Sequence, residues 1–359
     1  MLTLLRRTDW QLIVPAIVLI IISLTTLFSI NPVFFRSQLL FVGISVVIFI
    51  VLTQVDIFQL AFYRKYIYIA SLILLVLLLL LGVASRGAVR WIGLFGFGVQ
   101  FSEILKPLLL LVLASYLTSV RNVSFKTFLL VLAFLAPVAF LIYRQPDLGS
   151  ALIYVMTVLL TLILYGFPLW WFGAGILATI ASFPVLWHFL QAYQRERLLT
   201  FFHLTNDPLG TSYNAIQAII AVGSGQFVGS GFGQGTQSVL RFLPERQTDF
   251  IFATLAEDLG FLGTMLVVGA FLFLLYRFFV IFVETDDVFS KVVVAGSFSL
   301  ILIQFFVNIG MNIGILPIVG VPLPFVSYGG SSLVASTIVL AIVSQIAGRA
   351  KKKHVLEIT

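Results

Sequence analysis

Long apolar stretches recur along the whole chain, separated by shorter polar segments. Ten of them are candidates for membrane spans, at 12–30, 39–55, 66–84, 107–117, 128–143, 148–165, 170–190, 260–279, 292–311 and 333–347. Their apolar residues run continuously, without the period-two alternation of a transmembrane strand. A helix needs about 20 such residues to cross a bilayer. The pattern predicts an all-α polytopic membrane protein with about ten transmembrane helices, forming a single integral membrane domain over 1–359.

Two segments depart from this regular pattern. The fourth stretch is too short for a span unless its helix begins upstream, near Ser102. The segment 191–248 contains no span, and structureless loops of this length are usually functional or disordered. Because it is rich in aromatic residues, we expect an ordered loop on the outer membrane face. Within it, residues 193–202 mix charged and apolar side chains, as expected of a helix in the membrane interface.

Composition narrows the class of protein further. The chain is 60% hydrophobic and 10% charged, with a mean hydropathy of +1.13, whereas soluble domains carry about 25% charged residues. These values exclude a soluble enzyme, a disordered chain and a solvated nucleic-acid binder. The absence of cysteine excludes thiolate chemistry, disulfides and Cys-ligated zinc, and three scattered histidines argue against a His-rich metal site.

The distribution of charge predicts the orientation in the membrane. An even number of spans places both termini on one side, and cytoplasmic termini put most of the 21 Lys and Arg residues inside. The loop 191–248, between spans seven and eight, is then extracytoplasmic. In a membrane protein the net charge of +7 affects orientation and the attraction to anionic lipids. We therefore expect no nucleic-acid partner.

Acidic residues at the ends of spans are the first candidates for chemistry. Glu103 and Lys106 are one helical turn apart and can pair, as a structural ion pair or as part of an active site. Asp147 lies in the turn between the fifth and sixth spans, where an N-cap of the sixth helix is the favoured interpretation. Glu257 and Asp258 lie eight and nine residues beyond Asp249, about 12–14 Å deeper on a regular helix leading into the eighth span, and we expect a structural or gating role for them.

The segment 241–250 offers the strongest candidate. Thr248 or Asp249 would be a good N-cap for the eighth helix. Alternatively, Asp249 is a general base at the rim of an apolar span, with Arg241 and Arg246 holding a counter-anion. On a regular helix Asp258 would face away from Asp249, so one site is not expected to use both.

Two unusual loops suggest where a substrate binds. Glycines recur between 223 and 235 without the pattern of a nucleotide-binding loop. The loop either presents N–H groups to an anion such as a lipid-linked diphosphate or is simply flexible. The segment 316–331 is apolar but contains three prolines. Irregular backbone at membrane depth must be covered by protein, so we expect it to fold back beside a substrate groove, with an ordinary loop as the alternative.

Two classes of protein fit these features: an enzyme acting on an amphiphilic anionic substrate at the outer leaflet, and a transporter of such a substrate. A transporter is expected to carry ionisable or broken-helix sites near the midplane. Most charged residues outside the cytoplasmic loops collect instead at one rim, which favours the enzyme.

Six motifs resemble those of the SEDS family of bacterial cell-wall proteins. They are Gly-x-x-Arg-Trp at 87–91, Ser-Glu-x-x-Lys at 102–106, Gln-Pro-Asp-Leu-Gly at 145–149, Gly-x-Gly-Thr-Gln-Ser at 233–238, Phe-Leu-Pro-Glu-Arg-Gln-Thr-Asp-Phe-Ile-Phe at 242–252, and Pro-x-x-Ser-Tyr-Gly-Gly-Ser at 324–331. The sequences of these motifs are more similar to those of family members that act in cell elongation than to those of members that act in division. Phe101 replaces the family's usual Pro, and Asp258 its usual Glu.

The resemblance implies a peptidoglycan glycosyltransferase in the bacterial cytoplasmic membrane, with its active site on the extracytoplasmic side. Such a protein polymerises lipid II, and its expected partners are a class B penicillin-binding protein and other elongation-complex proteins. Translocation of lipid II is the alternative activity. The family's essential aspartate falls on Asp249, and its charged pair falls on Glu103 and Lys106.

The implied chemistry is an inverting transfer that releases undecaprenyl diphosphate. Asp249 would take the proton of the attacking hydroxyl, or would bind a divalent cation such as Mg²⁺ or Mn²⁺. Lys106 is a further candidate for stabilising the departing diphosphate. The remaining residues expected to bind substrate or diphosphate are Arg90, Arg144, Arg195, Arg197, Arg241, Arg246 and Ser327.

Overall fold

The computed structural model describes residues 9–85, 88–94, 97–120, 122–202, 213–235, 237 and 242–358. Within these residues, ten helical segments are long and apolar enough to cross a membrane, as predicted. They are α2 (Trp10–Ile30), α3 (Pro32–Leu52), α4 to α5 (Ile57–Leu81), α6 (Phe101–Val120), α7 (Phe125–Arg144), α8 (Leu148–Tyr165), α9 (Leu169–Phe189), α13 (Ile251–Glu284), α14 (Val288–Asn312) and α15 (Gly330–Ile358). The fourth span begins at Phe101, next to the expected start.

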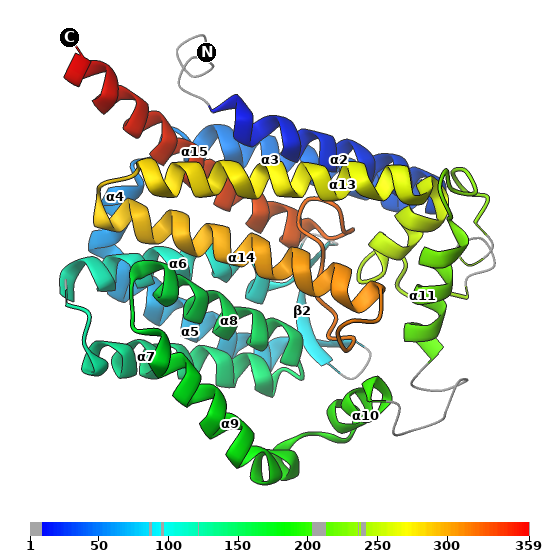
Figure 1. Ribbon diagram of the computed structural model, residues 1–359, viewed down its shortest axis with the longest axis horizontal. Coiled ribbons are helices and arrows are strands. Elements are labelled where there is room, and N and C mark those ends of the chain that lie inside the picture. The colour runs from blue at the N-terminus through cyan, green and yellow to red at the C-terminus, as the bar shows by residue number, and fades with distance from the viewer. Residues whose placement is uncertain are drawn as a thin grey trace.

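The helices differ in how much of their surface the protein itself covers. In α15 and α6, 83% and 67% of the spanning window is buried, whereas in α9 the value is 0%. α14 packs against α6, α8 and α13. Together with the high burial of α6 and α15, this places α6, α14 and α15 at the centre of the bundle, whereas α9 lies at its edge (Figure 1). α2 begins and α15 ends at the same end of the bundle, as an even number of spans requires.

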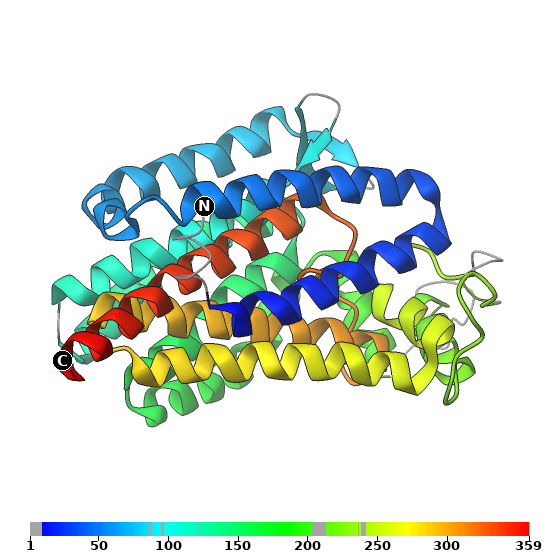
Figure 2. The ribbon, with the colours of Figure 1, turned by 90° about the horizontal axis from the view of Figure 1, so that it is seen from above.

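A small antiparallel sheet follows α5, which an all-α prediction did not include. Strands β1 (Val83–Ser85), β2 (Ala88–Leu94) and β3 (Phe97–Val99) pair in the order β1-β2-β3, and β2 contacts α5 and α6. Figure 2 shows the strands directly after α5, beside the bundle. The prediction failed here because it considered only apolar runs long enough to span, and these strands are short.

The long loop 191–248 contains two described helices, of which the sequence indicated the first. α10 (Ala192–Phe201) forms where a mixed apolar and charged segment was noted, and α11 (Tyr213–Ser224) packs against α13. Ala218 and Ala221 of α11 form a second, smaller core with Leu243, Phe250 and Ala253. This core fixes the described part of the loop to the start of α13.

α13 is interrupted at Gly260, whose φ of 66° and ψ of −162° are not helical. The glycine-containing loop after α11 supplies the hydrogen bonds that the interruption leaves unmade. The N–H groups of Ser230 and Gly231 donate to the carbonyls of Glu257 and Asp258, at 2.9 and 3.0 Å. These two N–H groups are therefore bonded within the protein. The loop was expected either to bind an anion or to be flexible, and these bonds give it a packing role.

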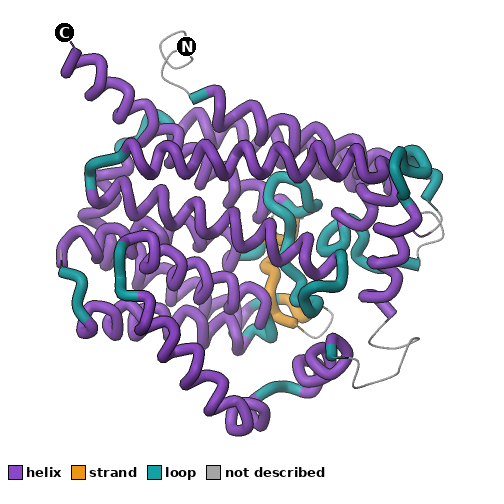
Figure 3. The backbone as a smooth tube through the Cα atoms, viewed as in Figure 1, coloured by secondary structure: helices purple, strands orange, loops and turns teal. Residues whose placement is uncertain are grey.

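Irregular segments gather at the end of the bundle opposite the start of α2. Figure 3 shows the strands and the loop between α14 and α15 close together in this region. The start of α13 lies at the same end (Figure 1). Candidate residues that are far apart in the sequence therefore meet there.

Candidate active site

A cavity of about 490 Å³ opens at this end of the bundle. It brings together Glu103 of the fourth span and Asp249, which immediately precedes the eighth. Its other lining residues are Trp91, Gln100, Arg197, Asn214, Glu245, Thr248, Phe250, Ile318, Gly320, Pro322, Tyr328, Gly329, Ser331 and Ser332. The cavity thus draws on the sheet, both helices of the long loop, and the segment between α14 and α15.

The segment 313–329 forms one wall and has irregular backbone, as its prolines predicted. It packs closely on the start of α8, because a Cβ added at Gly149 would lie 2.1 Å from the carbonyl oxygen of Val319. Gly320 has a φ of 70°, and a Cβ there would lie 3.3 Å from Oδ2 of Asp249. The segment therefore folds back into the protein and passes directly beside the Asp249 carboxylate.

The same segment also holds the main chain that precedes Asp249. The N–H of Tyr328 donates to the carbonyl of Gln247 at 2.8 Å, and Oγ of Ser327 donates to the carbonyl of Thr248 at 2.6 Å. Two consecutive carbonyls, of Gln247 and Thr248, are thus bonded to this segment. The main chain that leads to Asp249 is therefore held in place before any substrate binds.

The expectation that Thr248 or Asp249 caps the eighth helix was wrong. α13 begins at Ile251 with Phe250 in the N-cap position, and no side chain of the cap accepts a hydrogen bond there. The Thr248 hydroxyl donates instead to the carbonyl of Glu245, at 3.2 Å. Asp249 lies in a turn outside the helix.

Ser327 was expected to bind substrate or diphosphate, but it is 2% exposed and is not among the residues that line the cavity. Its hydroxyl donates to the carbonyl of Thr248 and accepts from the N–H of Leu323, at 2.7 Å. We therefore predict that Ser327→Ala lowers the melting temperature and leaves KM for substrate unchanged, since a buried donor lost in this way costs about 1–3 kcal/mol. A raised KM in a variant of normal stability would restore the binding role.

Glu103 and Lys106 form the ion pair that their spacing predicted. The Lys106 ammonium lies 2.5 Å from Oε1 of Glu103, and both side chains are 3% exposed. A buried pair of this kind is not by itself a source of stability, because removing two charges from water is costly. The position of the pair relates it to the cavity. Glu103 lines the cavity, and Lys106 lies one helical turn deeper in the bundle.

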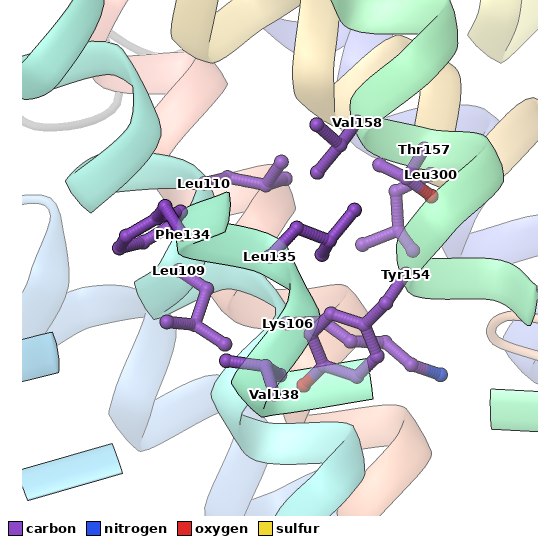
Figure 4. Close-up of a pocket in the computed structure, with 10 residues that line it drawn as sticks. All are labelled: Lys106, Leu109, Leu110, Phe134, Leu135, Val138, Tyr154, Thr157, Val158 and Leu300. Carbon is purple, nitrogen blue, oxygen red and sulfur yellow. The ribbon is translucent and has the colours of Figure 1, made fainter. Parts of the chain in front are cut away.

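Figure 4 shows the surroundings of Lys106 on the inner side of the pair. Its aliphatic chain and Tyr154 lie at the edge of a second, small pocket of about 20 Å³. Apart from Thr157, the other lining residues are Leu, Val and Phe side chains. Because these apolar groups offer no counter-charge, Glu103 is the described partner that keeps the ammonium paired.

Asp147 is the N-cap of α8, as predicted, and also joins a network that reaches the cavity. Its carboxylate accepts from the N–H and hydroxyl of Ser150 and from Nε2 of Gln100 at 3.2 Å. The N–H of Gln100 donates in turn to Oγ of Ser331 at 2.9 Å. Sequence reasoning missed Gln100 and Ser331 as site residues, although Ser331 ends the last motif and Gln100 adjoins the second.

The candidate arginines are dispersed. Of those whose side chains the structure describes, Arg197 lines the cavity, and its Nη1 donates to the carbonyl of Ile318 at 3.1 Å. Arg144 is exposed at the end of α7, and Arg195 donates to the carbonyl of His188. Arg246 lies close enough to Asp258 to act on its charge. The side chain of Arg90 and the whole of Arg241 lie outside the described residues.

Neither Glu257 nor Asp258 lines the cavity, and for Asp258 this agrees with the helical position expected from the sequence. Both are 1% exposed, and they end the first part of α13, before Gly260. Ser29, near the C-terminal end of α2, is a close neighbour of Asp258. The two carboxylates therefore lie at the level where α2 ends.

The model of the cell cycle protein family that comprises FtsW, RodA and SpoVE matches residues 3–352. The chain belongs to this family. The match covers the cavity and every span, so it includes all the residues discussed above.

Among curated FtsW/RodA/SpoVE proteins, the peptidoglycan glycosyltransferase MrdB of Escherichia coli K12 is 38% identical over 85% of this chain and 83% of its own length. The stage V sporulation protein E of Bacillus subtilis is 33% identical over 90% of this chain and 93% of its own length. The MrdB of Helicobacter pylori strain 26695 is 34% identical over 91% and 87%.

Solved structures of the family have the same fold. A chain from a peptidoglycan synthase complex that coordinates polymerization and crosslinking matches with a TM-score of 0.81 and 28% identity, covering 96% of this chain and 98% of that one. The rod shape determining protein RodA of Thermus thermophilus matches with a TM-score of 0.72 and 26% identity, over 95% and 96%. The resemblance to the elongation members noted from the motifs is thus confirmed.

Proposed function

We propose that the protein is a peptidoglycan glycosyltransferase that polymerises lipid II into glycan strands during cell elongation. The observation that carries the proposal is the cavity itself. Asp249 and Glu103 line it together, within a chain 38% identical to a named peptidoglycan glycosyltransferase. A volume of about 490 Å³ is within the range of small-molecule sites and suits the sugar end of an amphiphilic substrate.

Asp249 is the proposed general base. The sugar hydroxyl of one lipid II molecule attacks the anomeric carbon that carries undecaprenyl diphosphate on the growing strand, and the diphosphate leaves with inversion. The carboxylate accepts the hydroxyl proton as the new bond forms. The close approach of Gly320 and the bonded carbonyls of Gln247 and Thr248 support this role, because a base acts best when it is held in place.

Cationic groups would stabilise the charge that develops on the departing diphosphate. Arg197 is the best supported candidate, because it lines the cavity from α10. Lys106 acts in this proposal through Glu103, since its ammonium is buried and paired below the cavity. Arg90, Arg144, Arg195, Arg241 and Arg246 remain candidates for binding diphosphate.

A divalent cation would take few ligands from the protein. The described residues contain no group of three or more His, Cys, Asp or Glu side chains able to hold a metal ion. Mg²⁺ or Mn²⁺ would therefore be bound mainly by diphosphate and water, with Asp249 as the single carboxylate, and would screen the negative charge of the leaving group. The steps assigned above to the protein's own residues do not depend on such an ion.

The proposed setting is the bacterial cytoplasmic membrane, with the cavity on its extracytoplasmic side. Positive charge on the side of the termini supports this orientation. The proposed partner is a class B penicillin-binding protein, a transpeptidase that cross-links the new strand. A structural relative from a complex that coordinates polymerization and crosslinking supports this pairing.

The competing activity is translocation of lipid II, and one experiment separates the two. Purified protein and partner are placed in vesicles with fluorescent lipid II, and we measure both released undecaprenyl diphosphate and the leaflet in which lipid II resides. We expect release in step with glycan formation. Leaflet exchange without release would favour the transporter. Loss of activity in EDTA, restored by Mg²⁺, would show that the reaction needs a divalent cation.

A further inference from the structure

Two asparagines of α14, Asn308 and Asn312, are fully buried and bind the main chain of Asp249. Their Nδ2 atoms donate to the Asp249 carbonyl at 3.1 and 3.0 Å. Buried amides are costly unless their polar atoms are bonded. Each Nδ2 also has a second acceptor: the carbonyl of Val321 at 2.7 Å for Asn308, and the carbonyl of Asn308 at 2.8 Å for Asn312.

Asn312 occupies the place of a helical hydrogen bond. In a regular helix the N–H of Ala253 would donate to the carbonyl of Asp249, four residues earlier. Here the N–H of Ala253 donates to Oδ1 of Asn312 at 3.1 Å, while the Asp249 carbonyl accepts from Nδ2 of the same side chain. The amide of Asn312 thus bridges the two groups that would otherwise bond to each other. The next helical bond, from Thr254 to Phe250, is made at 3.1 Å.

This bridge explains why α13 begins at Ile251 and not earlier. N-terminal N–H groups of a helix need acceptors, and no side chain of the cap residue provides one. An asparagine from another helix provides it instead. Without the bridge the helix could extend by one turn to include Asp249. Each residue of a helix turns by about 100°, so the carboxylate would leave its place beside Gly320.

We propose that Asn312, assisted by Asn308, is a positioning residue that keeps Asp249 outside α13 with its carboxylate facing the cavity. Asn308 extends the effect, because its bond to Val321 ties the Pro-rich wall of the cavity to the same carbonyl. Neither asparagine lines the cavity, so each acts through Asp249. The catalytic consequence rests on the proposed function, whereas the structural bridge does not.

The first test is amide hydrogen exchange in the full-length protein. Asn312→Leu keeps the size of the side chain and removes the bridge, and we expect exchange in the peptide covering 247–254 to accelerate at least about tenfold. Gln304→Leu is the matched control, since Gln304 is also a buried amide of α14 at 3% exposure and no described hydrogen bond joins it to Asp249. Unchanged exchange in Asn312→Leu would overturn the bridge, whatever reaction the protein catalyses.

The second test separates positioning from folding. We expect Asn312→Leu to lower kcat about 10- to 100-fold with KM for lipid II within about twofold, because a displacement of about 1 Å can cost 100-fold. Asn312→Gln, which keeps both amide functions, should recover part of kcat, and Gln304→Leu should change neither constant. If Asn312→Leu fails to fold, Asn308→Leu is measured instead, because it removes the other side-chain bond to the Asp249 carbonyl. We then expect a smaller fall in kcat, and an unchanged kcat would overturn the positioning role.

The outcomes distinguish this inference from the proposed function. Accelerated exchange with unchanged kcat would show that Asp249 is held by Asn312 but is not catalytic. A kcat lowered by the same factor in the Gln304→Leu control as in Asn312→Leu would overturn positioning, because any buried amide of α14 would then have the same effect.

Discussion

Replacing Asp249 with asparagine is expected to lower glycan polymerisation by at least about 100-fold while the protein remains folded. General-base catalysis contributes about 10²–10⁴ in rate, and an asparagine amide cannot accept the proton of an attacking hydroxyl. The fold should survive, because asparagine keeps the size of the side chain and the main-chain carbonyl that Asn308 and Asn312 bind. The rate of strand formation from lipid II and the melting temperature are the two measurements.

Glu284→Gln provides the matched control for this substitution. Glu284 ends the same helix, α13, is exposed, and lies at the other end of the bundle. Neutralising it should leave both rate and stability unchanged. Near-normal polymerisation by Asp249→Asn would remove Asp249 from the mechanism as either base or metal ligand, and the cavity would lose its proposed function.

Replacing Lys106 with methionine is expected to have the largest effect on stability. Methionine preserves the length of the side chain but leaves the carboxylate of Glu103 buried without its cation, and breaking a buried pair in this way costs about 3–5 kcal/mol. We also expect a strong loss of activity, because Glu103 lines the cavity. Thermal unfolding of the purified protein in detergent measures the first effect.

The double variant Glu103→Gln, Lys106→Met separates the two roles of the pair. Removing both charges should restore most of the stability, since neither group is then left charged and unpaired. Activity should stay low, because in the double variant the cavity lacks the Glu103 carboxylate. Normal polymerisation by the stable double variant would reduce the pair to a structural one.

Much of the fold could be predicted because a membrane limits the alternatives. Continuous apolar runs with few charges must become helices in lipid, so span number and type followed from the sequence. The same rule indicated that the segment 316–331 folds back against protein. The strands at 83–99 were missed because they are short, and Gly260 gave no local sign that α13 is interrupted there.

The site was only partly predictable. Glu103 and Lys106 were found because helical spacing places them on one face, and Asp249 because a carboxylate near arginines at the edge of a span is unusual. Asn308 and Asn312 were missed, since each reads as one polar residue in an apolar helix until tertiary packing places α14 beside Asp249. The arginines of the long loop could not be ranked, because their distance from Asp249 depends on how that loop folds.

A structure of the Asp249→Asn variant bound to lipid II would test the central claim most directly. The variant should bind substrate without consuming it. The account predicts sugars in the cavity lined by Glu103, Arg197 and Tyr328, with the attacking hydroxyl about 3 Å from the side chain at position 249. Lipid II bound elsewhere, with no sugar hydroxyl within reach of that side chain, would contradict it.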